Sequence, residues 1–425
     1  MPAGPTSSRV EKTEPLVRRG ARVPLSPSVS VCLLVLSDPG MALRCLDSLA
    51  GEVRHHGVEV VVVANGTRPR DRRPLDERDD IVLVRSGVNL GFSGGNNLAA
   101  AVAGGSFLLL LNDDSIVEEG CIERLVSTAE GDPRIGAVGG RILSADGTLQ
   151  EAGSVLWDDG TTDYVGRGLP AGSAAYGYLR DVDFVSANGL LVRRQAWEEV
   201  GGLDERYFPA YYEDADLCMA VRQHRYRVVY EPRARITHLE TRSTTGPFRT
   251  FLLRRNRRLF MDKWAEQLPT FDSRPAGPDE IAIDRAVQRA RGAPPRLLVV
   301  PDRAEGSGDR MGEIIEGLAR AGWAVSVSSP APPRVLSVPN PVRAERLVDL
   351  GVDLLERGPG EALTVISPVD AVLLGPSVRW RPPTVVRTDG TVAPVVRIPA
   401  DGDASSVVQV IDGMTRPPRS TRFGD

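Results

Sequence analysis

The chain has 425 residues, of which 41% are apolar and 25% are charged, a composition typical of a soluble globular protein long enough for two domains. Its net charge of −4 provides no basic field of the kind that wholesale nucleic-acid binding requires, so we expect no nucleic-acid partner. The four cysteines lie far apart and form no CxxC pair, which favours a cytoplasmic location, and no run of about 18 apolar residues could span a membrane.

The first part of the chain predicts an α/β domain. Residues 1–27 are rich in Pro, Ser, Arg and Gly without an apolar h-region, so we expect a disordered leader and not a signal peptide. From Val29 onward, short apolar runs alternate with amphipathic stretches, as in parallel βα units. Strands rich in Val and Leu are buried on both faces, as in a parallel sheet covered by helices. We predict strands at 29–36, 58–63, 81–85 and 107–111, and helices at 41–53 and 96–103.

Polar residues follow two of these strands at their carboxyl ends, where ligands of parallel sheets collect. Asn112-Asp113-Asp114 closes the apolar run 107–111, and Asn65 follows the second strand. Clustered carboxylates at such a position indicate a divalent cation and therefore phosphate chemistry. The competing interpretation is that the acidic pair only caps a helix, which we expect to begin at 115–118.

The second half of this domain is expected to shape an acceptor site. We predict a strand-like stretch, a turn and a helix at 182–193, 201–202 and 213–223. Glu213, Asp214 and Asp216 fall in the first turn of that helix, where the helix dipole favours the ionised form, so we expect them to be anionic at neutral pH. Because residues two apart in a helix point to roughly opposite sides, at most one of Asp214 and Asp216 can face a substrate.

Several short motifs occur in order between about Val29 and Trp264. They are Asn89-Leu90-Gly91-Phe92 with Gly95-Asn96-Asn97, the acidic Asn112-Asp113-Asp114, Gly201-Gly202-Leu203-Asp204-Glu205 with Tyr207-Phe208, the pair Glu213-Asp214, and Pro232 followed by His238. Each is weak alone, but their order and spacing resemble the family-2 glycosyltransferases, the large GT-A group that includes bacterial rhamnosyl- and galactofuranosyltransferases. The resemblance implies an α/β fold, the GT-A nucleotide-diphospho-sugar transferase fold with a mostly parallel Rossmann-like sheet, followed by a smaller α/β domain.

The resemblance also implies a reaction. It implies inverting transfer from a nucleoside diphosphate sugar, with dTDP-rhamnose mildly favoured, to an acceptor hydroxyl on a glycan, glycolipid or small molecule. Asp114 and His238 would hold Mn²⁺ or Mg²⁺ against the diphosphate, and Asp214 would be the catalytic base. The other implied roles are donor contacts at Asn65, Asn89, Gly91, Asn96, Asn97 and Asp113, and acceptor-side contacts at Asp204 and Glu213.

Structural alternatives exist for several of these residues. His238 could be an ordinary partly buried side chain, Asp204 could fix the turn at 201–202, and Asn96 and Asn97 could cap a helix. The family often has Asp-Asn after the second strand, where the Asp helps recognise the nucleobase, whereas this chain has Ala64-Asn65. The choice among dTDP-, UDP- and GDP-linked donors therefore stays open, with Asp38 or backbone groups as candidates to replace that contact.

Residues 248–268 predict a basic amphipathic helix that completes a catalytic domain at 28–269. Its apolar residues Phe248, Phe251, Leu252, Leu259 and Phe260 are expected to pack on that domain. The arginines offer an alternative, peripheral contact with an anionic lipid surface or a lipid-linked acceptor, which would place the protein at the inner face of the membrane.

A linker and helix at 270–294 lead to a second α/β pattern at 295–415, and a disordered tail is expected at 416–425. We predict a loop at 306–308, a helix at 311–321 and strands at 296–300, 323–328, 363–366 and 384–386. This segment is similar to the amino-terminal half of GT-B glycosyltransferases, and we interpret it as a degenerate accessory or assembly domain.

Two alternatives to an active sugar transferase remain. The first is a catalytically silent GT-A domain that acts as a binding or scaffold subunit, which Ala64 and the short second domain suggest. The second is a dinucleotide-dependent oxidoreductase, but no strand of this sequence is followed directly by GxGxxG. The Asp114, Asp214 and His238 set favours the transferase.

Overall fold

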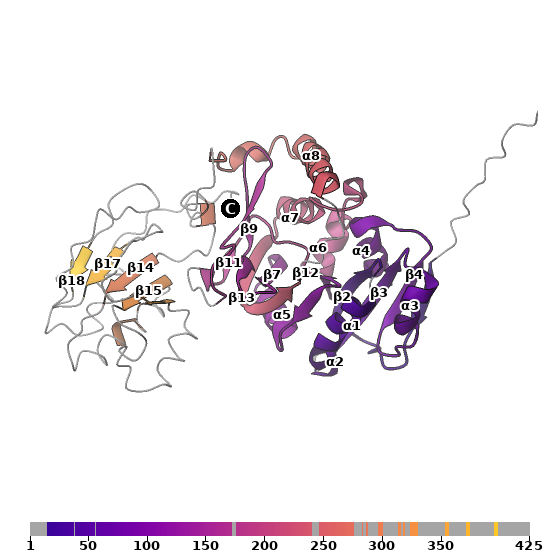
Figure 1. Cartoon of the computed structure of the whole chain (residues 1–425). Coiled ribbons are helices and arrows are strands. Elements are labelled where there is room, and N and C mark those ends of the chain that lie inside the picture. The colour runs from indigo at the N-terminus through magenta and orange to yellow at the C-terminus, as the bar shows by residue number, and fades with distance from the viewer. Residues whose placement is uncertain are drawn as a thin grey trace, which may run out of the picture.

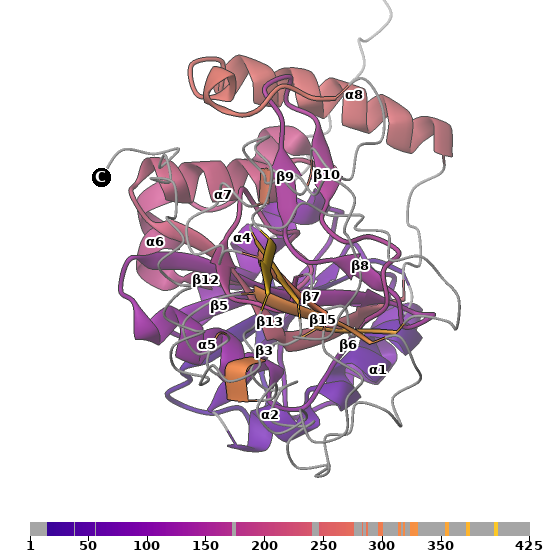
Figure 2. The same ribbon diagram turned by 90° about the vertical axis from the view of Figure 1, so that its left-hand side faces the viewer.

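The computed structural model describes residues 15–37, 39–55, 57–171, 176–239 and 246–275, and shorter pieces beyond them. Its main unit is an eleven-stranded sheet covered by helices (Figure 1 and Figure 2). The strands of this sheet are β1 (Leu16–Arg19), β2 (Val29–Val35), β3 (Val58–Asn65), β4 (Val82–Ser86), β5 (Phe107–Asn112), β6 (Ser115–Val117), β7 (Ile135–Ser144), β8 (Leu149–Glu151), β11 (Arg180–Asp181), β12 (Leu190–Arg193) and β13 (Arg227–His238). Their order is β1-β4-β3-β2-β5-β12-β7-β13-β11, with β6 paired to β13 and β8 paired to β7.

Strands β2 to β5 form a parallel part of the sheet, as predicted, whereas β1 is antiparallel to β4. Strands β4, β3, β2 and β5 all run in the same direction, which brings Asn65 and Asn112 to one edge. Alternate residues of β3 enter two different apolar cores, Val61 and Val63 on one face and Val60 and Val62 on the other. This burial of both faces is why the strands are rich in Val and Leu.

Helices cover both cores. The first core includes residues of α4, α6 and α7, and the second includes residues of α1, α3 and α5. The helices that flank the sheet are α1 (Pro39–Ser48), α2 (Ala50–His55), α3 (Pro69–Asp76), α4 (Gly91–Val102), α5 (Cys121–Gly131), α6 (Arg194–Val200) and α7 (Glu213–Gln223). The predicted helix at 213–223 is confirmed with the same bounds.

The second half of the sheet mixes strand directions. Strand β12 is antiparallel to both neighbours, β5 and β7, whereas β13 runs parallel to β7. The short strand β6 pairs antiparallel with the end of β13, with Ser115 opposite His238. The predicted helix start at 115–118 is therefore wrong: β13 supplies backbone hydrogen-bond partners to residues 115–117, and the next helix, α5, begins only at Cys121.

Three other predicted boundaries differ. Leu16–Arg19, expected to lie in a disordered leader, forms the edge strand β1, which pairs antiparallel with β4. The predicted helix 41–53 is two helices, and the predicted helix 96–103 begins earlier, at Gly91. Within the predicted strand 182–193, only 190–193 forms β12. The backbone before it bonds to several different partners and not along one strand: the Val182 amide donates to the Val228 carbonyl, the Phe184 carbonyl accepts from the Ser154 amide, and Glu151 accepts from the Ser186 amide, each at 3.0 Å.

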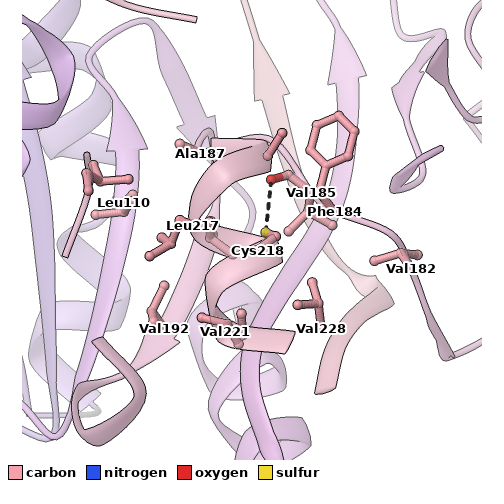
Figure 3. Close-up of a cluster of buried hydrophobic side chains, with 14 of the residues drawn as sticks. Leu110, Val182, Phe184, Val185, Ala187, Val192, Leu217, Cys218, Val221 and Val228 are labelled. Atoms are coloured by element: carbon pink, nitrogen blue, oxygen red, sulfur yellow. Dashed lines mark hydrogen bonds between the residues drawn. The ribbon is translucent and has the colours of Figure 1, made fainter. Parts of the chain in front are cut away.

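Helix α7 packs tightly on the sheet next to the predicted acceptor side. Figure 3 shows Leu217, Cys218 and Val221 of this helix facing Val185, Val192 and Val228, and the Cys218 thiol lies 3.9 Å from the Val185 carbonyl. Burial raises the pKa of this thiol to about 12, so it stays protonated and apolar. Gly139 of β7 makes room for this packing, because a Cβ there would lie 2.5 Å from the Val185 Cβ.

A hairpin and a long helix complete the unit. The hairpin pairs β9 (Ser154–Leu156) with β10 (Thr162–Tyr164), and Figure 2 shows α8 (Gly246–Lys263) lying beside it and across α7. Arg257 of α8 donates to the carbonyl of Asp159 in the hairpin turn at 2.7 Å. Two short 3-10 helices belong to the same unit: η2 (Glu205–Tyr207) precedes α7 in the chain, and η3 (Leu268–Thr270) follows α8.

Five further strands form a separate parallel sheet in the carboxyl-terminal part of the chain. They are β14 (Arg296–Val300), β15 (Ala324–Ser329), β16 (Asp353–Glu356), β17 (Ala371–Leu374) and β18 (Val395–Arg397), in the order β16-β15-β14-β17-β18. The predicted strand 296–300 is confirmed, and the one at 323–328 lies within one residue of β15. The loop at 306–308, the strands at 363–366 and 384–386 and the tail lie outside the described residues, as does most of the helix at 311–321.

Candidate active site

Asp114 and His238 meet at the carboxyl edge of the sheet, although 124 positions separate them in the printed sequence. Asp114 follows β5 in a tight turn, and the pairing of β6 with β13 brings the end of β13 beside it. His238 Nε2 lies 3.1 Å from Asp114 Oδ1, and the Leu239 amide donates to the Asp114 carbonyl at 2.9 Å. Both side chains are largely buried: 16% of the His238 side-chain surface and 7% of the Asp114 side-chain surface are exposed.

The far side of His238 is also held. Both polar atoms of the Gln150 amide lie within hydrogen-bond distance of His238 Nδ1, Nε2 at 3.0 Å and Oε1 at 3.2 Å. Asn112 Nδ2 lies 3.4 Å from His238 Nε2. The imidazole plane is thus fixed by strand residues on two sides.

These residues fit part of a divalent cation site. An imidazole nitrogen and a carboxylate oxygen are suitable ligands for Mn²⁺, and Mg²⁺ is usually held by one or two carboxylates, with substrate phosphates and water as its other ligands. In the described part of the chain, no group of three His, Cys, Asp or Glu side chains is arranged to hold a metal ion. A cation here would therefore take two ligands from Asp114 and His238 and the rest from substrate and water.

Asp113 and Cys45 lie next to this pair. Asp113 is half-buried in the same turn as Asp114. Burial, together with the charges of Asp113 and Asp114, raises the pKa of the Cys45 thiol. Cys45 is therefore no thiolate ligand at neutral pH.

Asp214 is the second residue of helix α7, and its carboxylate is held by two backbone amides. Oδ1 accepts from Ala215 at 2.8 Å and Oδ2 accepts from Ala187 at 3.4 Å. Burial raises the pKa of Asp214 despite these bonds, and burial followed by the charge of Asp214 raises the pKa of Glu213 well above its usual range. The pKa values of both groups are thus shifted opposite to the direction that the helix dipole favours, because loss of hydration outweighs the dipole.

Asp216 faces away from Asp214, as the helical spacing predicted. It is buried and accepts hydrogen bonds from Tyr207 Oη at 3.0 Å, Trp264 Nε1 at 2.8 Å and Lys263 Nζ at 2.7 Å. Tyr207 belongs to η2, Lys263 is the last residue of α8, and Trp264 follows it directly. Asp216 is therefore a structural carboxylate that joins three elements.

Glu151, which sequence reasoning missed, is a third buried carboxyl near Asp214. Only 1% of its surface is exposed, and Oε1 accepts from Ser154 Oγ and the Ser186 amide, each at 3.0 Å. Among the described residues, Oε2 has no hydrogen-bond partner. Burial, with a further contribution from Asp214, raises its pKa. No sequence signal marks it, because β8 is only three residues long.

The loop before Asp214 is unusual, and α8 holds it. Tyr211 and Tyr212 have φ angles of 81° and 78°, a region that non-glycine residues rarely adopt. The buried Asn256 Nδ2 lies within 3.1 Å of the carbonyls of Tyr207, Ala210 and Tyr211. Asn256 is a second residue that sequence reasoning missed. The signal that could have found it is a polar residue on the helix face that also carries Leu252 and Phe260. Such strained residues cluster at functional sites.

The predicted donor residues Asn65 and Asn89 shape the start of α4. Asn65 Nδ2 donates to Gly91 O at 3.0 Å and to Asn89 Oδ1 at 3.2 Å, and its Oδ1 accepts from the Leu90 amide at 2.8 Å. Asn89 Oδ1 also accepts from the Gly91 amide at 2.8 Å. Gly91 has a φ of +71°, and a Cβ there would lie 2.7 Å from the ring of Phe208, so only glycine fits.

Asn96 and Asn97 lie inside α4, so the alternative that they cap a helix is wrong. Asn96 is buried and donates to the Phe92 carbonyl at 3.0 Å. Asn97 reaches the loop before η2, where its side chain bonds to the backbone of Leu203. Ala64 is buried at the end of β3, and Asp38 lies outside the described residues.

Asp204 is held by cations. It caps η2 by accepting from the Arg206 amide at 3.1 Å, and Lys263 Nζ lies 3.1 Å from its Oδ2. Hydrogen bonds from Arg206 and then from Lys263 hold the pKa of Asp204 well below its usual range. These contacts give Asp204 a structural role as the cap of η2, which they link to Lys263.

Helix α8 is only partly packed on the domain. Leu252 and Phe260 are buried as expected, but the prediction is wrong for Phe248 and Phe251, which are 47% and 58% exposed. Their rings stack on each other 6.4 Å apart, because both lie on the helix face that points away from the core. In the described part of the chain, no helix is long and apolar enough to cross a membrane.

A largely parallel α/β sheet with its polar residues gathered at the carboxyl edge is the fold of the GT-A glycosyltransferases. Comparison with family models gives the same class: residues 30–173 match "Glycosyl transferase family 2", and residues 107–267 match "Glycosyl transferase family group 2". Together the two matches span residues 30–267, so this region is similar to the family-2 glycosyltransferases.

Curated relatives match part of the chain. The chain is 32% identical over 248 residues to the O-antigen biosynthesis protein RfbC of Myxococcus xanthus, a match that covers 56% of this chain and 19% of RfbC. It is 34% identical over 136 residues to an N-acetylglucosaminyl-diphospho-decaprenol L-rhamnosyltransferase of Mycobacterium tuberculosis, covering 29% of this chain and 44% of that protein. The chain thus spans less than half the length of each of these relatives.

Solved structures show a more distant similarity. GalNAc-T7 with UDP, GalNAc and Mn²⁺ aligns with a TM-score of 0.46 and 14% identity, over 58% of this chain and 49% of that one. Residues 1–349 of S. aureus TarS align with a TM-score of 0.41 and 14% identity, over 61% of this chain and 69% of that one.

Proposed function

We propose that the domain is a metal-dependent, inverting glycosyltransferase that moves a sugar from a nucleoside diphosphate to an acceptor hydroxyl. The observation that carries this proposal is the contact between His238 Nε2 and Asp114 Oδ1, 3.1 Å apart at the carboxyl edge of the sheet. These groups would hold Mn²⁺ or Mg²⁺ against the donor diphosphate. When bound, the cation stabilises the charge that develops on the leaving diphosphate.

Asp214 is the proposed base. The Ala187 and Ala215 amides fix its orientation, and burial raises its pKa. As the acceptor oxygen attacks the anomeric carbon, its proton passes to the Asp214 carboxylate and the bond to the diphosphate breaks. A positioned base of this kind contributes about 10²–10⁴-fold in rate. One displacement inverts the anomeric centre.

The donor and acceptor are proposed from two lines of support. The relatives' names concern O-antigen biosynthesis and transfer of L-rhamnose to a diphospho-decaprenol lipid, and the sequence at 89–97 resembles the rhamnosyltransferase branch. We therefore propose a dTDP-rhamnose donor and an acceptor in surface polysaccharide or glycolipid synthesis. Asn65, Asn89 and Gly91 would contribute to the donor pocket through the shape of the α4 start.

Peripheral membrane contact through α8 fits such a lipid-linked acceptor. The helix carries six cationic side chains and one carboxylate, and its exposed Phe248–Phe251 pair lies next to Arg249. Exposed aromatic rings among arginines are typical of segments that lie on anionic membranes.

The proposal is tested by thermal denaturation of the purified protein with UDP, dTDP or GDP, each with and without Mn²⁺. A ligand that binds only the folded state raises the midpoint by mass action. We expect a metal-dependent shift with one nucleotide that is absent in Asp114→Ala and retained in the control Asp262→Ala, which removes an exposed carboxylate of α8. Ala64→Asp, which restores the family's residue, should increase or redirect the nucleotide preference.

The alternative is a silent scaffold domain, which Ala64 favours because the usual base-recognising carboxylate is missing there. No shift with any nucleotide would support this scaffold and contradict the transferase. A shift that is equal in wild type and Asp114→Ala would contradict the proposed metal site.

A further inference from the structure

We propose that Gln150 is a positioning residue that pairs with His238 in both of its neutral tautomers and so prepares the imidazole for the cation. This inference rests on the proposed function, because it assigns Gln150 a task in the same metal site.

Three strands bring Gln150 to His238. Strand β8 pairs antiparallel with β7, with a register irregularity between Ile142 and Leu143, and β13 runs parallel to β7 with His238 opposite Ser144. Such irregularities re-aim side chains within a sheet. Gln150 is only 7% exposed, so its amide has little access to water. Losing the contact with His238 would therefore leave a buried polar group without a partner, which costs free energy.

The amide lies beside one ring nitrogen with both of its polar atoms. Gln150 Nε2 is 3.0 Å and Oε1 is 3.2 Å from His238 Nδ1. A neutral imidazole carries one N–H, and its other nitrogen accepts. A glutamine can serve Nδ1 in either form, whereas an ionised carboxylate only accepts and an ammonium only donates.

The two tautomers correspond to two states of the site. In the metal-free site we assign the proton to Nε2, because Nε2 lies 3.1 Å from Asp114 Oδ1, which can only accept when ionised, and Nδ1 then accepts from Gln150 Nε2. An Nε2 that gives its lone pair to a cation carries no proton, so Nδ1 must then carry one and donate it to Gln150 Oε1. Nε2 releases its proton to solvent and Nδ1 takes one from solvent, so the exchange between the two tautomers is balanced.

Partners on the far nitrogen of a metal-binding histidine fix its orientation, and their loss typically costs 10–100-fold in metal affinity. Gln150 differs from a carboxylate partner in that it also satisfies the metal-free form. The site is therefore held in place before the cation arrives.

The test uses the full chain and three variants. Gln150→Leu keeps the volume and removes both polar atoms, Gln150→Glu keeps only acceptors when ionised, and Gln195→Leu is the control, removing an exposed glutamine of α6. Binding of Mn²⁺ is measured by electron paramagnetic resonance in the presence of UDP or dTDP. The tautomer of His238 is read from imidazole ¹⁵N shifts of the metal-free protein, which are simple to assign because the chain has four histidines.

We expect Gln150→Leu to weaken Mn²⁺ binding about 10–100-fold and Gln195→Leu to leave it unchanged. Metal-free wild type should show the Nε2–H tautomer, and Gln150→Glu should place a proton on Nδ1. Near-UV circular dichroism equal to that of wild type verifies that each variant is folded.

Unchanged Mn²⁺ binding in Gln150→Leu, or an unchanged tautomer in Gln150→Glu, would overturn this inference. Wild-type protein that binds no Mn²⁺ with any nucleotide would instead overturn the proposed function and the metal-bound half of this inference. The ¹⁵N shifts of the metal-free protein would then still decide whether Gln150 sets the tautomer.

Discussion

Asn97 of α4 binds both backbone polar groups of Leu203, although 106 positions separate the two residues. Its Nδ2 donates to the Leu203 carbonyl and its Oδ1 accepts from the Leu203 amide, each at 2.9 Å. The helix that carries the proposed donor residues is thereby fixed to the loop that carries the proposed acceptor residues.

Asn97→Ala should destabilise the domain, because it leaves an amide and a carbonyl of Leu203 without their partner. The expected loss in the free energy of unfolding is about 1–3 kcal/mol, measured by urea denaturation. Gln195→Ala, which removes an exposed hydrogen bond to Glu199, should change stability by less than about 0.5 kcal/mol. Equal effects of the two substitutions would show that the Asn97 contact contributes nothing special.

Changing Asp214 or Asp216 to asparagine should have different effects, on the rate in the first case and on stability in the second. Asp214→Asn should lower the transfer rate about 10²–10⁴-fold without loss of stability. Asp216→Asn should instead lower the free energy of unfolding by about 1–3 kcal/mol, because it weakens the bonds to Tyr207, Lys263 and Trp264, while folded protein keeps its rate. Steady-state kinetics combined with thermal melting measures both effects, and a rate loss confined to Asp216→Asn would reverse the assignment.

The acid limb of the pH–rate profile should lie above the usual carboxyl range. Burial raises the pKa of Asp214, and the base must be deprotonated to accept the acceptor's proton, so the rate should rise as the pH increases through that raised pKa. Because Glu213 and Asp214 interact, the limb belongs to the pair. A rate already at its plateau at about pH 4, the ordinary carboxyl pKa, would contradict a buried base.

Glu151→Gln should stabilise the protein at neutral and alkaline pH. The pKa of Glu151 is raised in the folded state, so the carboxyl favours folding while protonated, and that contribution is lost as the pH rises through the folded-state pKa. A neutral amide keeps an acceptor for Ser154 and Ser186 without a charge to bury. The difference in melting temperature should vanish below about pH 4, where the wild-type carboxyl is also neutral. A difference that does not depend on pH would rule out this explanation.

Helix α8 should bind vesicles that contain anionic lipid, if the protein contacts membranes as proposed. Arg254 and Arg258 are exposed one turn apart on the described helix. Changing each to glutamate should weaken sedimentation with such vesicles by several-fold, since a basic residue near the surface contributes about 1 kcal/mol. Arg70→Glu, an exposed change on α3, is the control. Equal binding to neutral and anionic vesicles would contradict the electrostatic part of the proposal.

The parallel half of the fold could be predicted from sequence because its signals are local. Continuous Val and Leu runs identify β2, β3 and β5, and their common direction brings Asn65 and Asn112 to one edge. The second half depends on contacts distant in sequence. Residues 115–117 form a strand only because β13 lies beside them, and nothing within that segment distinguishes this outcome from a helix start.

Some residues of the candidate site could likewise be predicted from the sequence, and others could not. The Asp114–His238 contact was suggested by motif resemblance, whereas Gln150 and Glu151 belong to a three-residue strand without any pattern. The protonation of Glu213 and Asp214 depends on burial, which helix position alone does not reveal. Rules based on helix position predict the effect of the helix dipole on these carboxyls. They do not include the loss of hydration on burial, which has the larger effect on both pKa values.

The position of β12 has a consequence for synthesis of the protein. This strand lies between β5 and β7, yet the ribosome makes it after both. A nascent chain that ends at residue 173, where the first family match stops, holds β2 to β5 and β7 without the strand that joins them. The sheet can close only after Arg193 has been made, and Asp114 meets His238 only after β13 is complete. Until then, the edges of β5 and β7 expose unpaired backbone groups that a chaperone or a neighbouring chain can occupy.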